Sequence, residues 1–348
     1  MENMTNNKFT PLSSLGEFGL IEHLTKNISI THKSTVKGVG DDAAVLDYGN
    51  KYVILTTDLL TEGIHFNLVY TPLKHLGYKS VVVNLSDVYA MNATPRQITV
   101  SLTISSKFSL EHIEELYKGI TLACEKYGVD LVGGDTTSSL TGLTISITAI
   151  GEVEKDKVVY RSGAKINDLI CVTGNLGGSY MGLQLLERER ALFEIRGVEK
   201  PDFGNYSYIL ERQLKPEARK DIIEFFKENN ILPTSMIDIS DGLSSELLHL
   251  CKSSGTGCSI YQDKIPIDAE TGRMADEFNI SAITAALNGG EDYELLFTVP
   301  TDKYEIISKK QGISIIGHVT EQDNEAQLIL NDGSKVKITA QGWNALNK

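Results

Sequence analysis

The sequence predicts an α+β protein built from two packed domains, and three observations support this prediction. The chain has 348 residues, about twice the roughly 150 residues expected of one domain. Its 41% hydrophobic and 23% charged residues are typical of a globular protein with an ample core, and they exclude a disordered chain. Strand-like and helical runs are mixed throughout, but two long strand-like runs, 97–105 and 143–153, do not fit a simple alternation of strand and helix.

Strands are predicted where β-branched and other apolar residues recur with a period of two. Such a run is half-buried when it forms a strand, because successive side chains point to opposite faces of the sheet. Six runs meet this description: 52–58, 97–105, 143–153, 169–174, 295–300 and 313–320.

Helices are predicted between these strands from their capping residues. The clearest helix spans 110–127, because Ser109 precedes it as an N-cap and Gly128 follows it. Proline suits the first turn of a helix, which predicts a second helix over 216–229. A third helix is expected over 242–252.

A fourth helix is expected over 74–92, where a long apolar stretch is interrupted by Asn84, Ser86 and Asp87. A helix that is apolar on most sides is buried, so each polar group in it needs a partner. For Asp87 that partner is a bound cation, a basic group such as Lys79, or several hydrogen-bond donors.

The domain division is predicted at the short charged stretch 154–157, after which a new pattern of helices and strands begins. This gives an N-terminal domain over 1–155 and a C-terminal domain over 156–348. The stretch 187–205 is rich in charged residues and reads as a loop or insertion.

Charge and composition exclude several function classes. The 46 acidic and 33 basic side chains give a net charge of −13, which argues against binding to a nucleic-acid backbone. No apolar run approaches the roughly 18 residues of a membrane helix, and no secretory leader is visible, so we expect a cytoplasmic protein. The four cysteines form no CxxC pair, which indicates reduced thiols and disfavours zinc.

The motif Gly38-Val39-Gly40-Asp41-Asp42-Ala43 matches a dinucleotide-binding fingerprint only formally. Its two carboxylates would repel a pyrophosphate, and no convincing strand precedes it. Carboxylates beside a phosphate make sense when a divalent cation lies between them. The alternative is an exposed acidic turn.

Other acids also stand beside glycine or hydroxyl residues. Asp58 follows two threonines at a strand end, and Asp135 follows two glycines in a stretch that is either a phosphate-binding loop or a hairpin turn. Ser240 and Asp241 either bind a ligand or cap the following helix. Glu291 lies in an acidic turn before a strand. Several Mg²⁺ ions bridging polyphosphate oxygens would explain this recurrence of acids.

Basic groups near glycine are fewer. Arg161 and Lys165 form the one compact basic pair beside a glycine that could meet a nucleotide phosphate. His65 is a general base, a phosphate donor or a surface residue.

Taken together, these motifs closely resemble those of the bacterial thiamine-monophosphate kinases. The family belongs to the superfamily of aminoimidazole ribonucleotide synthetase, selenophosphate synthetase and a hydrogenase maturation factor. The resemblance covers roughly residues 15 to 300, and Asn92 and Asn167 stand where the family usually has glycine. The motifs that carry it are GVGDDAAVL (38–46), TTDLLTEGIHF (56–66), GYKSVVVNLSDVYAMNATP (77–95), GGDTT (133–137), RSGAK (161–165), IDISDGLSSEL (237–247) and GGEDYELLF (289–297).

The resemblance implies two α/β domains, with N-terminal domains that pair into a homodimer sharing a β-barrel. It implies ATP bound in the N-terminal domain, a C-terminal domain that completes the site, and Mg²⁺-assisted in-line phosphoryl transfer from ATP to thiamine monophosphate. The implied catalytic acids are Asp42, Asp58, Asp87, Asp135 and Asp238. The implied Mg²⁺ ligands are Asp42, Thr56, Thr57, Asp58, Asp87, Asp135, Asp238 and Asp241. The implied nucleotide contacts are Gly134, Asp135, Arg161 and Ser240, and the implied contacts to thiamine monophosphate are His65, Glu291 and Trp343.

Two other functions stay open at this point. Another enzyme of the superfamily would act on a different acceptor, although selenophosphate synthetase would need a reactive cysteine in an N-terminal loop, and the first cysteine here is Cys124. A nucleotide-binding module without turnover would keep the metal site and release no ADP.

Overall fold

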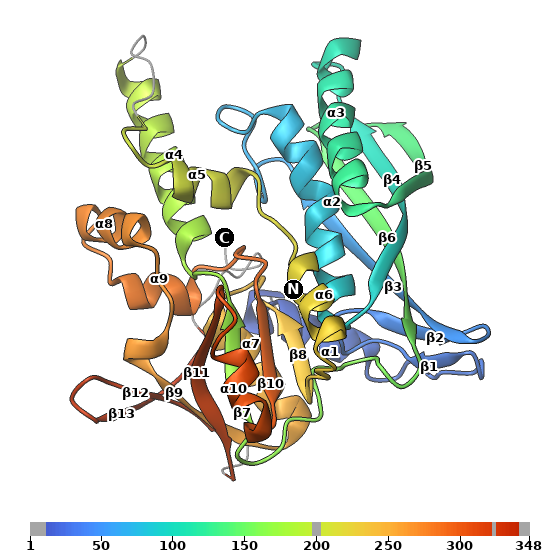
Figure 1. The fold of residues 1–348 in the computed structure, drawn as a ribbon. Coiled ribbons are helices and arrows are strands. Elements are labelled where there is room, and N and C mark those ends of the chain that lie inside the picture. Colours follow the sequence, from blue (N-terminus) through green and yellow to red (C-terminus); the bar gives the residue numbers. More distant parts are fainter. Residues whose placement is uncertain (1–11, 197–202, 322–324, 341–348) are drawn as a thin grey trace, which may run out of the picture.

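A computed structural model describes residues 12–196, 203–321 and 325–340, and it places their strands in two sheets (Figure 1). The first sheet has the order β1-β2-β3-β6-β4-β5, with β4 and β5 parallel and the other pairs antiparallel. Its strands are β1 (Thr35–Lys37), β2 (Ala44–Asp47), β3 (Lys51–Thr61), β4 (Thr94–Ile104), β5 (Asp130–Ser138) and β6 (Thr144–Glu154).

The second sheet has the order β13-β12-β9-β11-β7-β10-β8. Only β9 and β12 pair in parallel among its described strands. Its strands are β7 (Leu169–Thr173), β8 (Ser235–Asp238), β9 (Gly257–Tyr261), β10 (Leu295–Val299), β11 (Ile313–Thr320), β12 (Ala326–Ile329) and β13 (Lys335–Lys337).

Helices flank both sheets. They are α1 (Gly16–Thr25), α2 (Leu73–Ala90), α3 (Leu110–Tyr127), α4 (Gly178–Arg196), α5 (Ser207–Leu214), α6 (Lys220–Glu228), α7 (Leu243–Ser254), α8 (Ala269–Glu277), α9 (Ala282–Asn288) and α10 (Tyr304–Ile307), with short 3₁₀ turns at Leu12–Ser14, Gln262–Lys264 and Thr301–Lys303.

Helix α2 is the centre of the molecule. It packs on β3, β4 and β6 of the first sheet and on β8 of the second, and almost all of its residues are buried. Its backbone lies directly against that of α3 at Gly77. A Cβ at this position would lie 2.0 Å from the Leu116 carbonyl oxygen, so only glycine fits there. Leu85 of α2 and Phe297 of β10 belong to one hydrophobic cluster, so the two sheets share a core around this helix.

The other face of the first sheet is open to solvent. Figure 1 shows α2 and α3 on one side of β3, β4 and β6 and no helix on the opposite side. Thr57 and Leu59 of β3 project to this open side and are exposed. Every residue of β5, the last strand of the sheet, is exposed.

Several sequence predictions are confirmed. Helix α3 has the predicted bounds and ends at Gly128, which adopts a left-handed φ of 70°. Strand β11 also has the predicted bounds, and the helix expected over 74–92 is the buried α2. Asn92 and Asn167 adopt φ values of 55° and 70°, the conformation for which glycine is usually chosen.

Other predictions of secondary structure are wrong. The stretch 187–205 is helical up to Arg196, because Arg190 pairs along the helix with Glu187 and Glu194. The helix expected from Pro216 begins only at Lys220, since Glu217 is held outside it by the hydroxyls of two tyrosines. A short strand, β1, does precede the Gly38 motif.

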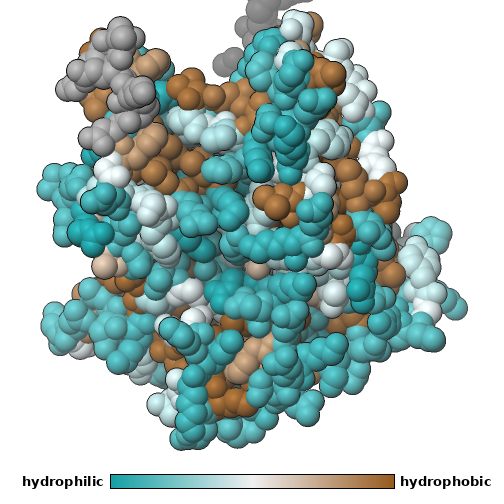
Figure 2. Space-filling model, turned by 45° about the horizontal axis from the view of Figure 1, so that its top comes forward, coloured by the Kyte–Doolittle hydropathy of each residue, from teal (hydrophilic) through white to brown (hydrophobic). Residues whose placement is uncertain are grey.

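In the described part of the chain, no helix is both long enough and apolar enough to cross a bilayer. Figure 2 shows hydrophilic side chains over most of the visible face, with apolar groups gathered in smaller patches between them.

Candidate active site

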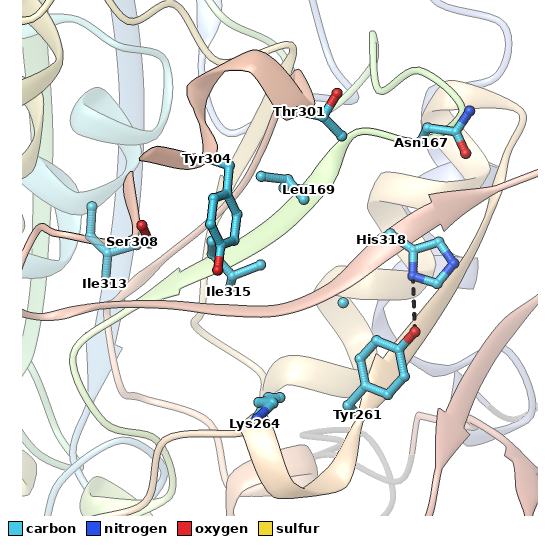
Figure 3. A pocket seen from close by; sticks show the side chains of 11 residues that line it. Asn167, Leu169, Tyr261, Lys264, Thr301, Tyr304, Ser308, Ile313, Ile315 and His318 are labelled. Carbon is cyan, nitrogen blue, oxygen red and sulfur yellow. Dashed lines mark hydrogen bonds between the residues drawn. The ribbon is translucent and has the colours of Figure 1, made fainter. Parts of the chain in front are cut away.

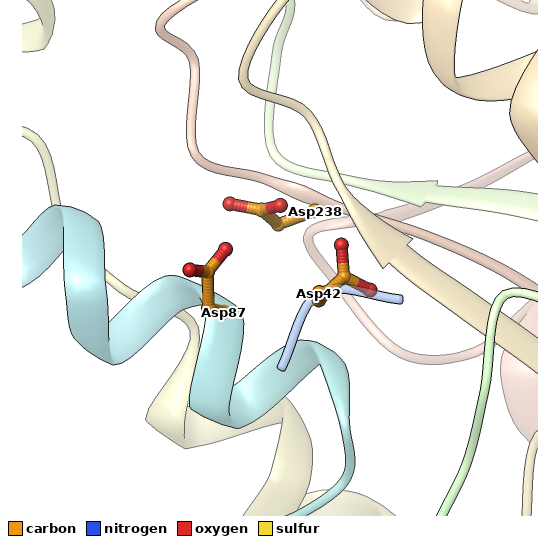
Figure 4. A group of neighbouring side chains, drawn as sticks. All are labelled: Asp42, Asp87 and Asp238. Atoms are coloured by element: carbon orange, nitrogen blue, oxygen red, sulfur yellow. The ribbon is translucent and has the colours of Figure 1, made fainter. Parts of the chain in front are cut away.

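Three carboxylates from distant parts of the chain meet beside the central helix. Asp42 comes from the loop between β1 and β2, Asp87 from the last turn of α2, and Asp238 from the end of β8. One oxygen of each lies within 4.8 Å of the others, and Figure 4 shows the three groups pointing toward one another. Asp42 and Asp238 are only 7% and 3% exposed.

Neighbouring hydroxyls hold two of these carboxylates in place. Ser86 of α2 donates to Oδ2 of Asp238 at 2.6 Å, which joins the central helix to the second sheet. Thr56 of β3 donates to Oδ2 of Asp87 at 2.6 Å. The cluster is therefore built by α2 together with strands of both sheets.

The carboxylates repel one another in a buried site. Burial raises the pKa of Asp42 to about 7, against the opposing effect of Arg161, and raises the pKa of Asp238 to about 6. The pKa of Asp87 is raised well above its ordinary value by burial and by the charges of Asp58, Asp238 and Asp42. Such a site favours either protons or bound cations.

Among the described residues, Arg161 is the basic side chain that pairs with the cluster. Arg161 donates from Nη2 and Nε to Oδ1 of Asp42 at 2.5 and 3.0 Å. Oδ2 of Asp42 is buried and has no hydrogen-bond partner among the described residues. Neighbouring carboxylates with a buried oxygen that accepts no hydrogen bond suit a hard cation such as Mg²⁺, so these residues fit the metal that the sequence predicts.

Asp58 and Asp241 border the cluster. Burial raises the pKa of each to about 6. The backbone N–H of Asp58 donates to Asn84 of α2 at 2.9 Å, and that of Asp241 donates to Glu246 of α7 at 2.9 Å. Both acids are thus fixed by backbone contacts, and their carboxylates add to the negative charge of the site.

Thr57, Gly134 and Asp135 do not join this cluster. The Thr57 hydroxyl donates to the Ile147 carbonyl at 3.1 Å on the open face of the sheet, because neighbouring residues of a strand face opposite sides. Gly134 and Asp135 lie on β5, where a strand replaces the expected loop or turn. Glycine is needed at 134 because a Cβ there would lie 1.8 Å from the carbonyl oxygen of Val100 on β4.

A second polar group forms about His65 and Glu291. Nδ1 of His65 accepts the backbone N–H of Thr61 at 3.0 Å, so Nε2 carries the proton of the neutral ring. Burial lowers the pKa of His65, which favours that neutral form. Lys79 pairs with Glu291 and not with Asp87, so the salt bridge considered for Asp87 is absent from the described structure.

The remaining predicted residues are placed as follows. Ser240 accepts the N–H of Glu291 on its carbonyl oxygen at 2.6 Å, in the loop that also holds Asp241. Trp343 lies outside the described residues. The structure adds Glu246, a buried acid whose Oε2 has no partner among the described residues. Its position as the one acid of Leu243–Ser254 was the available signal.

A separate cavity of about 660 Å³ lies on the second sheet (Figure 3). Tyr304, Tyr261, Lys264 and Ile315 are among the residues that line it. None of the residues predicted for the site lines it, so the acidic cluster is not in this cavity.

Comparison with known proteins agrees with the two-sheet architecture. Residues 40–153 match the family described as AIR synthase related protein, N-terminal domain, and residues 166–329 match its C-terminal domain. A solved hydrogenase maturation protein HypE in complex with ATP shares the fold at 17% identity, with a TM-score of 0.68 over 97% of this chain and all of the other. The fold and the paired domain matches define an AIR synthase related protein.

The relatives with higher sequence identity belong to a narrower family. Thiamine-monophosphate kinases of Aquifex aeolicus and Bacillus subtilis are 34% and 33% identical, and each alignment covers 95% of this chain and at least 98% of the relative. A solved structure described as AaThiL complexed with AMPPCP and TMP has a TM-score of 0.83 at 33% identity, covering 97% of this chain and 99% of the other. This chain belongs to the thiamine-monophosphate kinase family.

Proposed function

We propose that this protein transfers the γ-phosphoryl group of ATP to the phosphate of thiamine monophosphate, forming thiamine diphosphate and ADP. The observation that carries the proposal is the meeting of Asp42, Asp87 and Asp238 at one buried point between the sheets. Two relatives that align with almost the whole chain are named thiamine-monophosphate kinases, and a solved relative is described as complexed with AMPPCP and TMP.

The main obstacle to this reaction is repulsion, because both donor and acceptor carry phosphate. Bound Mg²⁺ would supply the positive charge that neutralises phosphate oxygens of both substrates. Asp42, Asp87 and Asp238 are the proposed centre of the metal site, and Thr56, Asp58 and Asp241 are its proposed border. Holding the two substrates in line is then most of the catalytic task.

Arg161 is the proposed contact to the nucleotide. Its guanidinium keeps Asp42 in place and leaves further N–H donors for a phosphate. Ser240 is proposed to contact the nucleotide as well, from the loop between β8 and α7.

His65 is proposed to orient the acceptor and not to remove a proton. The acceptor phosphate has a second pKa of about 6 and is already ionised near neutral pH. A neutral His65 with its proton on Nε2 can donate one hydrogen bond to the substrate. Direct transfer without a phosphoenzyme, which the family resemblance implies, is part of the same proposal.

A second copy of the chain is proposed to cover the open face of the first sheet. β5 is a nine-residue edge strand that is exposed throughout, and it carries the apolar residues Leu131 and Val132. Such an edge readily pairs with another strand. Thr57 and Asp135 lie on this surface, so their proposed Mg²⁺ contacts depend on the homodimer.

The test is a product assay. The purified protein is incubated with Mg-ATP and thiamine monophosphate, and thiamine diphosphate and ADP are separated and quantified by chromatography. We expect equal amounts of both products, and neither when Mg²⁺ is left out. ADP without thiamine diphosphate would indicate an enzyme with another acceptor, and no product at all would indicate a nucleotide-binding module.

A further inference from the structure

The loop between β3 and α2, residues 62–72, carries His65 and is anchored at its first half. Glu62 accepts the backbone N–H of Leu143, the residue before β6, at 2.8 Å. Phe66 is buried in the hydrophobic cluster around α2. Both anchors belong to the first sheet and the helix that packs on it, so they place this half of the loop relative to that sheet.

The second half of the loop contacts a helix from a different part of the chain. Tyr70 donates its hydroxyl proton to Oε1 of Glu187 on α4 at 2.6 Å. Oε2 of the same carboxylate accepts from Arg190, three residues further along the helix, at 2.8 Å. Burial and the bond to Glu187 raise the pKa of Tyr70, which keeps the phenol protonated as the donor. A hydrogen bond to an ionised carboxylate is stronger than one between neutral groups.

Helix α4 also holds the loop before β10, residues 289–294. The backbone N–H groups of Gly177 and Ser179, at the start of the helix, donate to the Asp292 carboxylate at 2.7 and 3.4 Å. Asp292 is buried. A carboxylate is favourable at this place, because the first N–H groups of a helix have no partner within the helix. The start of α4 thus fixes the second loop.

One helix therefore joins the two loops. Glu187 lies eight residues after Ser179, which is about 12 Å along the helix axis. The loops carry His65 and Glu291, the two described residues that the family resemblance assigns to the acceptor. Loops are more mobile than the helices and strands that they connect. An element that fixes both loops in advance removes the cost of ordering them when a substrate binds.

We propose that Tyr70 and Glu187 are positioning residues, and that their hydrogen bond uses α4 to set the distance between the two loops before the acceptor binds. Neither residue has to touch a substrate or a metal ion for this role. The kinetic effect of the bond rests on the proposed function, whereas its effect on the loop 62–72 does not.

Tyr70→Phe tests the inference because it removes only the hydroxyl. We expect KM for thiamine monophosphate to rise about tenfold, since the loop must then be ordered on binding, with kcat changed less than about threefold. KM for ATP should change less than about twofold. Glu187→Ala should have the same effect. Glu187→Gln keeps an oxygen that accepts from Tyr70 and should restore most of the loss.

Tyr206→Phe is the matched control. Tyr206, the residue before α5, also donates its hydroxyl to a glutamate, Glu277 at the end of α8, so this bond joins two neighbours of α4 and not the loop 62–72. It should change neither KM. The double variant of Tyr70→Phe with Glu187→Ala should be no worse than either single variant, because both remove the same bond. Additive losses would contradict the pairing.

Hydrogen exchange tests the same bond without a substrate. The amides of Tyr70 and Thr71 donate to the Asn67 carbonyl, and in Tyr70→Phe they should exchange at least about fivefold faster than in the parent protein. Exchange at the parent rate overturns the inference. An unchanged KM for thiamine monophosphate, or a fall in kcat alone, also overturns it. A parent protein that shows the expected exchange but forms no thiamine diphosphate would overturn the proposed function alone.

Discussion

Ser86 donates its hydroxyl proton to Oδ2 of Asp238 at 2.6 Å, across 152 positions of the chain. Both groups are buried. The contact joins the central helix, which packs against the first sheet, to the last residue of β8 in the second. One hydrogen bond thus contributes to domain packing and to the position of a carboxylate in the candidate active site.

Ser86→Ala should therefore lower stability. The buried Asp238 carboxylate loses a donor, which we expect to lower the free energy of unfolding by about 1–3 kcal/mol. Denaturant unfolding of the metal-free protein measures the change. Ser105→Ala is the matched control, because the Ser105 hydroxyl is buried and makes no hydrogen bond to the described residues. Equal losses in the two variants would contradict this role of Ser86.

Asp87→Asn should separate activity from stability. Removing one charge relieves the repulsion with Asp58, Asp238 and Asp42, so the metal-free variant should melt a few degrees higher than the parent protein. Its turnover should fall by at least two orders of magnitude, since the cluster loses an anionic ligand. The exposed acid Asp156, changed to Asn, serves as the control. Parent-like turnover in Asp87→Asn would make Asp87 merely structural.

The metal-free protein should lose stability as the pH rises from about 4 to 7. Burial raises the pKa of Asp238 to about 6 and that of Asp42 to about 7, above their ordinary value near 4. The folded state therefore binds more protons than the unfolded state in this window, and stability falls as they dissociate.

This loss is measured by thermal unfolding at a series of pH values, with and without Mg²⁺. Mg²⁺ should raise Tm more at pH 8 than at pH 5, because cations and protons compete for the same oxygens. The Asp87→Asn variant should show a smaller pH dependence than the parent protein. An identical Mg²⁺ effect at both pH values would argue against a carboxylate metal site.

His65→Gln should raise KM for thiamine monophosphate by about tenfold with kcat nearly unchanged, because glutamine can still donate one hydrogen bond. Steady-state kinetics over a range of pH tests this expectation, with the exposed His32→Gln as control. A collapse of kcat that follows the pKa of a histidine in the parent protein would show that His65 acts as a base.

Val132→Lys should weaken self-association. Val132 is 58% exposed on the edge strand β5, and a charge there opposes pairing with a second copy. Analytical ultracentrifugation should find a dimer for the parent protein and a shift toward monomer for the variant. Val336→Lys, on an exposed strand of the second sheet, is the control. A parent protein that is monomeric at all concentrations would refute the proposed homodimer.

Local signals in the sequence predicted some elements well. Capping residues located the helix Leu110–Tyr127, and the apolar content of Leu73–Ala90 identified it as buried. A partner for Ser86 was also expected, because a polar group inside an apolar stretch needs one. Its identity was not predictable, since Asp238 reaches it only through tertiary packing.

Other elements depend on contacts that the sequence does not reveal. The glycines at 133 and 134 look like a loop, but the close approach of β4 makes them part of a strand. The acidic turn after Gly40 pointed to Asp42, the apolar stretch around Asp87 pointed to a buried carboxylate, and only the family resemblance pointed to Asp238. These three carboxylates meet in the structure, whereas Asp135, an acid beside two glycines, lies on an exposed strand. The domain boundary near 154–157 and the cytoplasmic location stay predictions.

The central claim is that Asp42, Asp87 and Asp238 hold the metal that brings two phosphorylated substrates together. The most direct measurement is an anomalous difference map from crystals grown with Mn²⁺ and ADP. We predict a metal peak within about 2.5 Å of a carboxylate oxygen from each of the three residues, and its loss in crystals of Asp87→Asn. Density for ADP with the metal bound elsewhere, and no peak at these three carboxylates, would contradict the account.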